Sequence, residues 1–310
     1  MKTMSTAELT LPALQGSSLL GFLAAIGVFR TLAMLPETSD VRMRWVPGGG
    51  SYCPVLRLPA PAEPDSIVEK LHTALLGLAG HYVITVDKDL KIPRADFRKL
   101  ATKAADDFLS HTDLTASGMV AAFGCDAVCN DEGVIEDTGF RTMSGAGHQH
   151  FLEFMNVLAK ETTAEQLREA IFGPWRYRDS SPTMRWDAED DRRYALRWDE
   201  PSKDPVRTVR GANLLAIAAL PFFPVVPTSG TTVATSGFSG RGSRDTFFTW
   251  PIWSAWLSPD VTGSLLNLTA LQPRNEVVSD ELRVLGVSTV YRSQRVTLGK
   301  FRNFTPAAPV

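Results

Sequence analysis

Residues 11–35 decide the fold, and they read LPALQGSSLLGFLAAIGVFRTLAML. We predict one helix over residues 17–35, because Ser17 or Ser18 can cap its start and Pro36 ends it. Apolar residues occur almost all round this helix, which is typical of a helix that is buried on every side. We therefore expect the rest of the chain to pack around it.

The same run resembles neither a membrane span nor a convincing signal peptide. Residues 15–18, QGSS, interrupt its approach, and Arg30 cuts the apolar run short of the length that crosses a bilayer. No other stretch of the sequence comes near that length. We expect a cytoplasmic protein with no membrane contact.

A strand pair follows the helix in the sequence. Residues 41–46 alternate between apolar and arginine side chains, glycines at 48–50 make a turn, and residues 52–58 return as the second strand. We predict a helix over residues 66–77 and a further strand over residues 81–86 next along the chain.

Helical patterns dominate the middle of the chain. We predict further helices over residues 94–109, 115–122, 150–160, 163–172 and 210–220. Between them, residues 134–143 are expected to form a short strand pair. Residues 175–205 are rich in charge and aromatics, and we expect a long loop with short strands there. Strand signals take over from residue 225 onward.

This order of elements predicts an α+β fold, with mixed helices, small antiparallel sheets and a strand-rich C-terminal part. We place an α+β N-terminal part at residues 1–174 and a helix followed by a strand-rich part at residues 175–310. The alternative is one interwoven domain, since no flexible linker separates the two parts.

Composition narrows the classes of function. The chain has 310 residues, of which 44% are hydrophobic and 21% charged, so it can bury a sizeable core. The net charge of −2 excludes a polycation, and any nucleic-acid site must be a local patch. The three cysteines argue against a disulfide framework.

Four carboxylates stand close together in residues 185–193, RWDAEDDRR: Asp187, Glu189, Asp190 and Asp191. Neighbouring carboxylates can hold Mg²⁺ for phosphodiester cleavage. We favour instead a solvated loop in which they pair with the flanking arginines, because metal sites usually gather ligands from separate elements. We thus expect no catalytic residue, metal or cofactor, and keep a metal-dependent nuclease as the alternative.

Arg241 and Arg244 lie in the glycine-rich stretch GFSGRGSR, residues 237–244. A loop of this kind could follow a phosphate backbone. A flexible hairpin tip has the same composition. Both interpretations stay open from the sequence.

The C-terminal segment carries the clearest binding signal. Residues 282–310 contain five basic side chains and no Asp or Glu. We predict that phosphates contact Arg292, Arg295, Lys300 and Arg302, and that bases stack on Tyr291 and Phe301. In a strand, Arg292 would face the side opposite Tyr291 and Arg295. The alternative is an edge strand protected by positive charge.

Five segments together resemble a known family, the large-subunit-like proteins of type I-U (also called I-G) CRISPR–Cas systems. They are LPALQGSSLLGFLAAIGVFRTL (11–32), MRWDAEDDRRYALRWDEPS (184–202), TVRGANLLAIAAL (208–220), FFTWPIW (247–253) and VYRSQRVTLGKFRNFTP (290–306).

The resemblance implies a non-catalytic, nucleic-acid-binding subunit of an antiviral effector complex. Its implied partners are crRNA, target DNA and other effector subunits, since cleavage in these systems resides in a separate helicase–nuclease. A purely structural protein–protein interaction subunit is the further alternative, because Arg and Trp are also enriched at protein interfaces.

Overall fold

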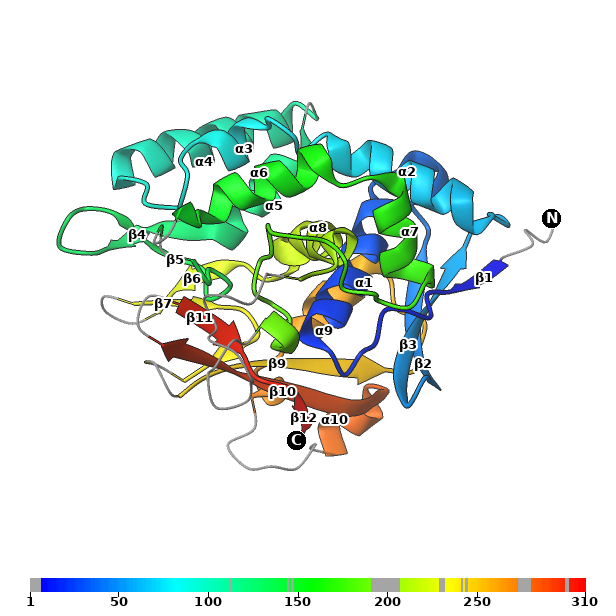
Figure 1. Ribbon diagram of the computed structural model, residues 1–310. Helices are drawn as coiled ribbons and strands as arrows, with labels where there is room; N and C mark the ends of the chain where they lie inside the picture. The colour runs from blue at the N-terminus through cyan, green and yellow to red at the C-terminus, as the bar shows by residue number, and fades with distance from the viewer. Residues whose placement is uncertain are drawn as a thin grey trace.

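Two apolar helices in contact occupy the centre of the molecule (Figure 1): α1 (Leu19–Ala33) and α8 (Arg210–Ala219). The computed structural model describes residues 7–111, 113–143, 145, 148–190, 207–228, 232–240, 242, 245–272, 280–298 and 301–310. Both central helices are confirmed as predicted, and every residue of α1 from Leu19 to Phe29 is buried.

The start and the packing of α1 follow from its small residues. Ser18 caps the helix, with its hydroxyl accepting a hydrogen bond from the Gly21 amide at 3.3 Å. At Gly27 the backbone of α8 comes so close that a Cβ atom would lie 1.7 Å from the Leu215 carbonyl oxygen. The two helices therefore touch backbone to backbone.

Further helices lie above this central pair in Figure 1. They are α2 (Pro64–Leu76), α3 (Tyr82–Thr85), α4 (Arg94–Leu109), α5 (Leu114–Phe123), α6 (Phe151–Glu161) and α7 (Ala164–Phe172). All of them except α3 were predicted, because apolar residues at helical spacing and capping residues mark them in the sequence. Asp113, for example, caps α5 by accepting from the amides of Thr115 and Ala116.

The strand predicted over residues 81–86 is wrong, because this segment holds the short helix α3. The β-branched residues favour a strand locally. However, the ring of His81 accepts a hydrogen bond from the Val83 amide and starts a helical turn. The third place in the nearby sheet is taken by β1 (Ala7–Thr10) instead.

That sheet has the order β1-β3-β2 and is antiparallel, with β2 at Arg42–Gly48 and β3 at Ser51–Leu58. The predicted hairpin is confirmed. Its turn uses Gly49 and Gly50, whose φ angles of +61° and +80° suit glycine.

A second sheet lies below the central helices in Figure 1 and follows the order β11-β10-β9-β8, with β12 also paired to β10. Its strands are β8 (Phe238–Ser239), β9 (Thr246–Trp253), β10 (Val287–Leu298), β11 (Phe301–Phe304) and β12 (Ala308–Pro309). Trp250 and Trp253 are fully buried core residues, and the ring of Trp250 lies 5.6 Å from that of Phe22 in α1. Helices α9 (Pro259–Leu266) and α10 (Asp280–Val284) separate β9 from β10 in the sequence.

Two short strand pairs complete the described elements. They are β4 (Gly124–Cys129) with β5 (Ile135–Asp137) and β6 (Val225–Pro227) with β7 (Val233–Thr235). The strand pair predicted within residues 134–143 is wrong: only β5 forms, and it pairs with β4, because the chain turns at Thr138. The described part of the expected loop, residues 175–190, is irregular apart from a single antiparallel β-bridge between Asp179 and Thr208 and a 3₁₀ turn at Ala188–Asp190.

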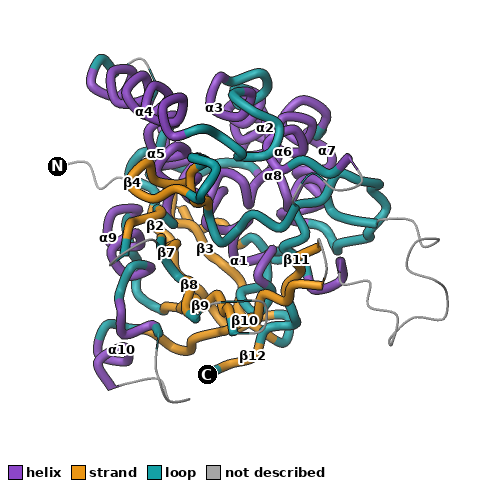
Figure 2. Tube along the Cα trace, turned by 90° about the vertical axis from the view of Figure 1, so that its left-hand side faces the viewer, coloured by secondary structure: helices purple, strands orange, loops and turns teal. Residues whose placement is uncertain are grey.

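The α+β class is confirmed, with most helices in the upper half and most strands in the lower half of Figure 2. One continuous apolar core runs from Leu11 to Phe304 and includes residues of both α1 and β9. The candidate site lies at the edge of this core, where β10 and β11 pair.

Candidate nucleic-acid interface

Strand β10 carries the basic and aromatic residues that the sequence singles out. Tyr291 pairs with Trp250 of β9, and Arg295 pairs with Thr246, so these two side chains are on one face of the sheet. Arg292 pairs with Thr249 and is on the opposite face. The alternation expected from the sequence is therefore present.

The face that carries Tyr291 and Arg295 is the one turned to the core. Tyr291 is half-buried, with its ring 6.1 Å from that of Trp250. Arg295 reaches across to the β5–Arg141 turn, where its Nη1 donates to the Gly139 carbonyl at 2.7 Å. Its Nε is buried and has no hydrogen-bond partner among the residues that the structure describes.

Arg302 joins Arg295 from the neighbouring strand. In the β10–β11 ladder Arg302 lies opposite Thr297, and Arg295 lies opposite Phe304, so both arginines project from the same face. The Nη1 of Arg302 donates to the Arg141 carbonyl at 3.0 Å. The structure therefore places two predicted phosphate ligands side by side.

Both arginines line a hollow of about 450 Å³, which we call the arginine hollow. Other polar side chains around it are Glu136, Asp137, Thr138, Thr228, Thr232, Thr235, Ser239 and Thr246. Of the two carboxylates, Asp137 is ion-paired with Arg141, and Glu136 is exposed. Neither Arg295 nor Arg302 forms an ion pair within the described part of the chain.

The two guanidinium charges in the arginine hollow lie close enough to repel each other, and this repulsion affects the pKa of Arg295. Burial, and then the charge of Arg302, lower the pKa of Arg295 to about 10, while Asp137 offsets part of the effect. Arg295 nevertheless stays protonated at neutral pH. An anion entering the hollow would relieve both the repulsion and the loss of solvation.

The remaining predicted binding residues do not join this pair in the described structure. Arg292 donates from Nε to the Thr249 hydroxyl at 3.1 Å, and its guanidinium lies 5.8 Å from the Phe247 ring centre. Arg241, Arg244 and Lys300 lie outside the described residues, and so does the side chain of Phe301.

Two of the four carboxylates are folded inward. Asp187 accepts from the Tyr177 hydroxyl at 3.0 Å, and Asp190 accepts from the Thr183 hydroxyl at 2.7 Å. Burial raises the pKa of Asp187 above its ordinary value. Glu189 is exposed, and Asp191 lies outside the described residues.

These contacts bear on the nuclease alternative. No group of three or more His, Cys, Asp or Glu side chains among the described residues is arranged to hold a metal ion. The sequence favoured a solvated loop for this run, and the solvated part of that interpretation is wrong for Asp187 and Asp190, because both are buried. Its arginine partners Arg192 and Arg193 lie outside the described residues.

Sequence reasoning missed the hydroxyl-bearing half of the arginine hollow. Thr228 and Thr232 share a hydrogen bond of 2.6 Å across the start of the β6–β7 pair, and Thr246 donates to the Gly242 carbonyl. The Thr-rich run at residues 231–235 is visible in the sequence. Only the packing of β7 beside β8, which pairs with β9, shows that this run borders the arginine hollow.

Comparison with known families, with curated proteins and with solved structures finds no match to this chain. Among the helices that the structure describes, none has both the length and the apolar character required to span a bilayer.

Proposed function

We propose that this chain binds nucleic acid without cleaving it, and that the arginine hollow holds a backbone phosphate. The observation that carries the proposal is the convergence of Arg295 and Arg302, which are charged, half-buried and without an ion pair in the described structure. Guanidinium groups match phosphate oxygens in charge and in hydrogen-bond geometry.

The groups around the two arginines also support the binding of a phosphate. The hydroxyl of Ser239 borders the hollow and can donate to a phosphate oxygen. The charge of Asp137 is engaged by Arg141, which limits its repulsion of an incoming anion. A single phosphate positioned here would fix the register of a strand without reading its sequence.

For the biological role, we propose a subunit of a type I CRISPR effector complex in antiviral defence. The support is the resemblance of five segments of this chain to type I-U proteins. These segments include most of α1, the whole of α8 and most of β9. The partners are crRNA or target DNA and the other effector subunits. In this role the chain contributes binding, and a separate protein supplies cleavage.

The test is binding of fluorescently labelled single-stranded RNA and DNA to the full chain across a salt series. The double variant Arg295→Gln with Arg302→Gln removes both arginine contacts to this one phosphate. We expect weaker binding and a logarithmic salt slope shallower by about 0.7, the contribution of one neutralised phosphate on a single strand. Fluorescence anisotropy measures both quantities.

The matched control is Arg283→Gln, because Arg283 is exposed and faces only Asp280 at 3.6 Å in the described structure. This variant should bind as the wild type does. Far-UV circular dichroism establishes that each variant is folded, and Arg302→Gln alone serves if the double variant is not. Equal affinity and equal salt slope for wild type and a folded variant would overturn the phosphate site.

A further inference from the structure

A second cavity, of about 420 Å³, lies between α1, α2 and α5, away from the strands of the arginine hollow. Its walls are largely apolar and include Met34, Leu75, Leu78 and Met119. Its few polar side chains include Arg30. A mainly apolar cavity with a small number of convergent polar groups is the usual form of a small-molecule site.

Arg30 is the unusual member of this cavity. It is the one charged side chain of the apolar helix α1, and little of it reaches solvent. Its guanidinium makes no hydrogen bond or ion pair with any residue that the structure describes. A guanidinium that is largely desolvated and has no protein partner is costly, so an anion that reached Arg30 through the cavity would stabilise it.

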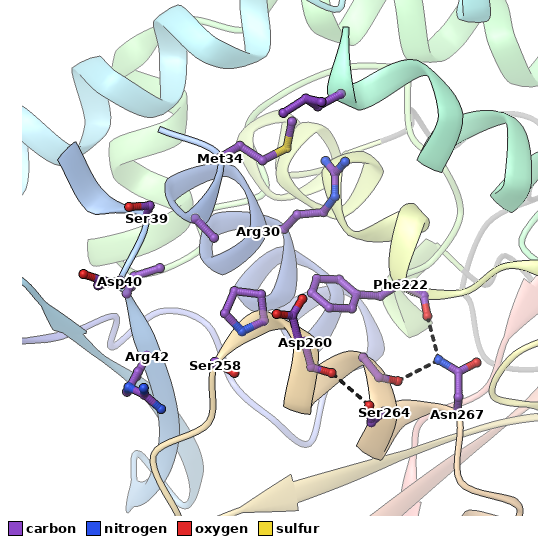
Figure 3. Close-up of a pocket in the computed structure, with 15 residues that line it drawn as sticks. Arg30, Met34, Ser39, Asp40, Arg42, Phe222, Ser258, Asp260, Ser264 and Asn267 are labelled. Carbon is purple, nitrogen blue, oxygen red and sulfur yellow. Dashed lines mark hydrogen bonds between the residues drawn. The ribbon is translucent and has the colours of Figure 1, made fainter. Parts of the chain in front are cut away.

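The guanidinium of Arg30 lies beside α5. A Cβ atom at Gly118 would lie 3.6 Å from Arg30 Nη2, an ordinary contact, and 2.9 Å from Pro221 Cβ, so the close approach at this glycine is to Pro221. Arg30 also lines an adjoining wider hollow, drawn in Figure 3. There its guanidinium is turned toward Met34 and away from Asp40 and Arg42.

The nearest carboxylate is already engaged. Asp113 attracts Arg30 through space, but its Oδ2 contacts His81 Nε2 at 2.6 Å. Its Oδ1 accepts from the amides of Thr115 and Ala116. Burial lowers the pKa of Arg30 to about 10, with Asp113 opposing the shift, so the arginine is charged at neutral pH.

We propose that this cavity binds a small organic anion, with its charged head on Arg30 and its apolar body against Met34, Leu75 and Met119. The head group is a carboxylate, a sulfonate or a phosphate ester, any of which a guanidinium holds through two parallel hydrogen bonds. This site shares no residue with the arginine hollow and does not depend on the proposed nucleic-acid role.

The test uses 1-anilinonaphthalene-8-sulfonate, an apolar anion whose fluorescence rises in apolar surroundings, titrated into the native chain. We expect saturable binding at one site. Octanoate and octyl phosphate should displace the dye, and the stronger of the two identifies the head group. The neutral 1-octanol and inorganic phosphate should each displace it far less, because each lacks one half of the ligand.

Arg30→Met keeps an unbranched apolar stem and removes the guanidinium with its charge. We expect it to weaken dye and octanoate binding at least about tenfold, the loss of one hydrogen bond to a charged group. Without ligand it should unfold at the same temperature as the wild type or a higher one, because a desolvated charge is gone. If Arg30 only stabilised the fold, Arg30→Met would instead unfold at a lower temperature than the wild type.

Two further variants make the outcome decisive. Arg42→Met removes a cation from the adjoining hollow alone and should bind as the wild type does. Ala74→Phe projects into the cavity from α2, leaves Arg30 in place and should also weaken binding. Unchanged dye binding in folded Arg30→Met or Ala74→Phe, or failure of both octanoate and octyl phosphate to displace the dye, would overturn the proposal.

Discussion

Arg141 shows what a single side chain contributes to the frame of the arginine hollow. It lies between Asp89, at 3.1 Å, and Asp137, and the three side chains are 12, 5 and 17% exposed. Burial alone would lower the pKa of Arg141, but Asp137 and Asp89 together hold it above its ordinary value. The group is thus a buried triad that ties β5 to the start of α6, where Asp89 accepts from the Phe151 amide.

Removal of Arg141 should therefore be severe. Arg141→Met leaves two buried carboxylates without a counter-charge, and we expect a loss of about 3–5 kcal/mol in the free energy of unfolding. Urea unfolding followed by circular dichroism measures it.

Arg98→Met is the comparison for Arg141→Met, because Arg98 and Asp126 form an exposed ion pair and its loss should change little. If the two variants were equally stable, the triad would not stabilise the fold.

Sequence reasoning could find candidate charges but not their partners. The run after residue 282 pointed to Arg295 and Arg302, and the strand periodicity separated Arg292 from them. Arg30 was noticed only because it interrupts an apolar helix. One partner of Arg141, Asp89, is 52 residues away in the chain, and His81 contacts Asp113 across 32 residues. Such pairings exist only once the elements are packed.

At the scale of elements, local patterns were sufficient for the longer helices. Capping and apolar spacing fixed α1, α4 and α8 to within a few residues. The short elements failed: β1 has four residues, and its partner β3 lies more than forty residues along the chain. The strand predicted over residues 81–86 failed because this segment is also short, and tertiary packing outweighs the β preference of a few residues.

The contact between α1 and α8 gives a sharp prediction at this scale. Gly27→Ala would place a Cβ atom 1.7 Å from the Leu215 carbonyl oxygen, which forces the two backbones apart. We expect a loss of at least about 2 kcal/mol in the free energy of unfolding, from denaturant titration.

The matched substitution for Gly27→Ala is Gly263→Ala in α9, where the nearest atoms are 3.5 Å away in the ring of Phe222. That change should raise the free energy of unfolding by about 0.5–1 kcal/mol, as alanine does in a helix. Equal effects of the two changes would contradict close contact at Gly27.

For the whole molecule, the near-zero net charge hides how charge is distributed. The chain carries −2 overall, yet its last 29 residues hold five basic side chains and no acidic one. Two of these five meet in the arginine hollow. This local positive charge supports the proposed binding of a nucleic-acid backbone, to which other chains of an assembly would add further contacts.

The proposed assembly is testable with the intact chain expressed in its own cells. Affinity purification through a tag should recover other effector subunits together with RNA that carries CRISPR repeat sequence. Sequencing of the bound RNA and mass spectrometry of the bound proteins measure this.

Nuclease treatment before elution separates the alternatives. A structural subunit would keep its protein partners and carry no repeat-derived RNA in any sample. Recovery of neither repeat-derived RNA nor effector subunits would rule out the CRISPR role.

The backbone contact at Gly27 also has a consequence for folding during synthesis. The ribosome makes α1 long before it makes α8, the helix that packs against α1 in the folded protein. Throughout that interval one of the most apolar segments of the chain lacks its permanent neighbour. The nascent chain therefore exposes an apolar helix until the ribosome has made α8, and we expect it to bind chaperones that shield apolar segments during that interval.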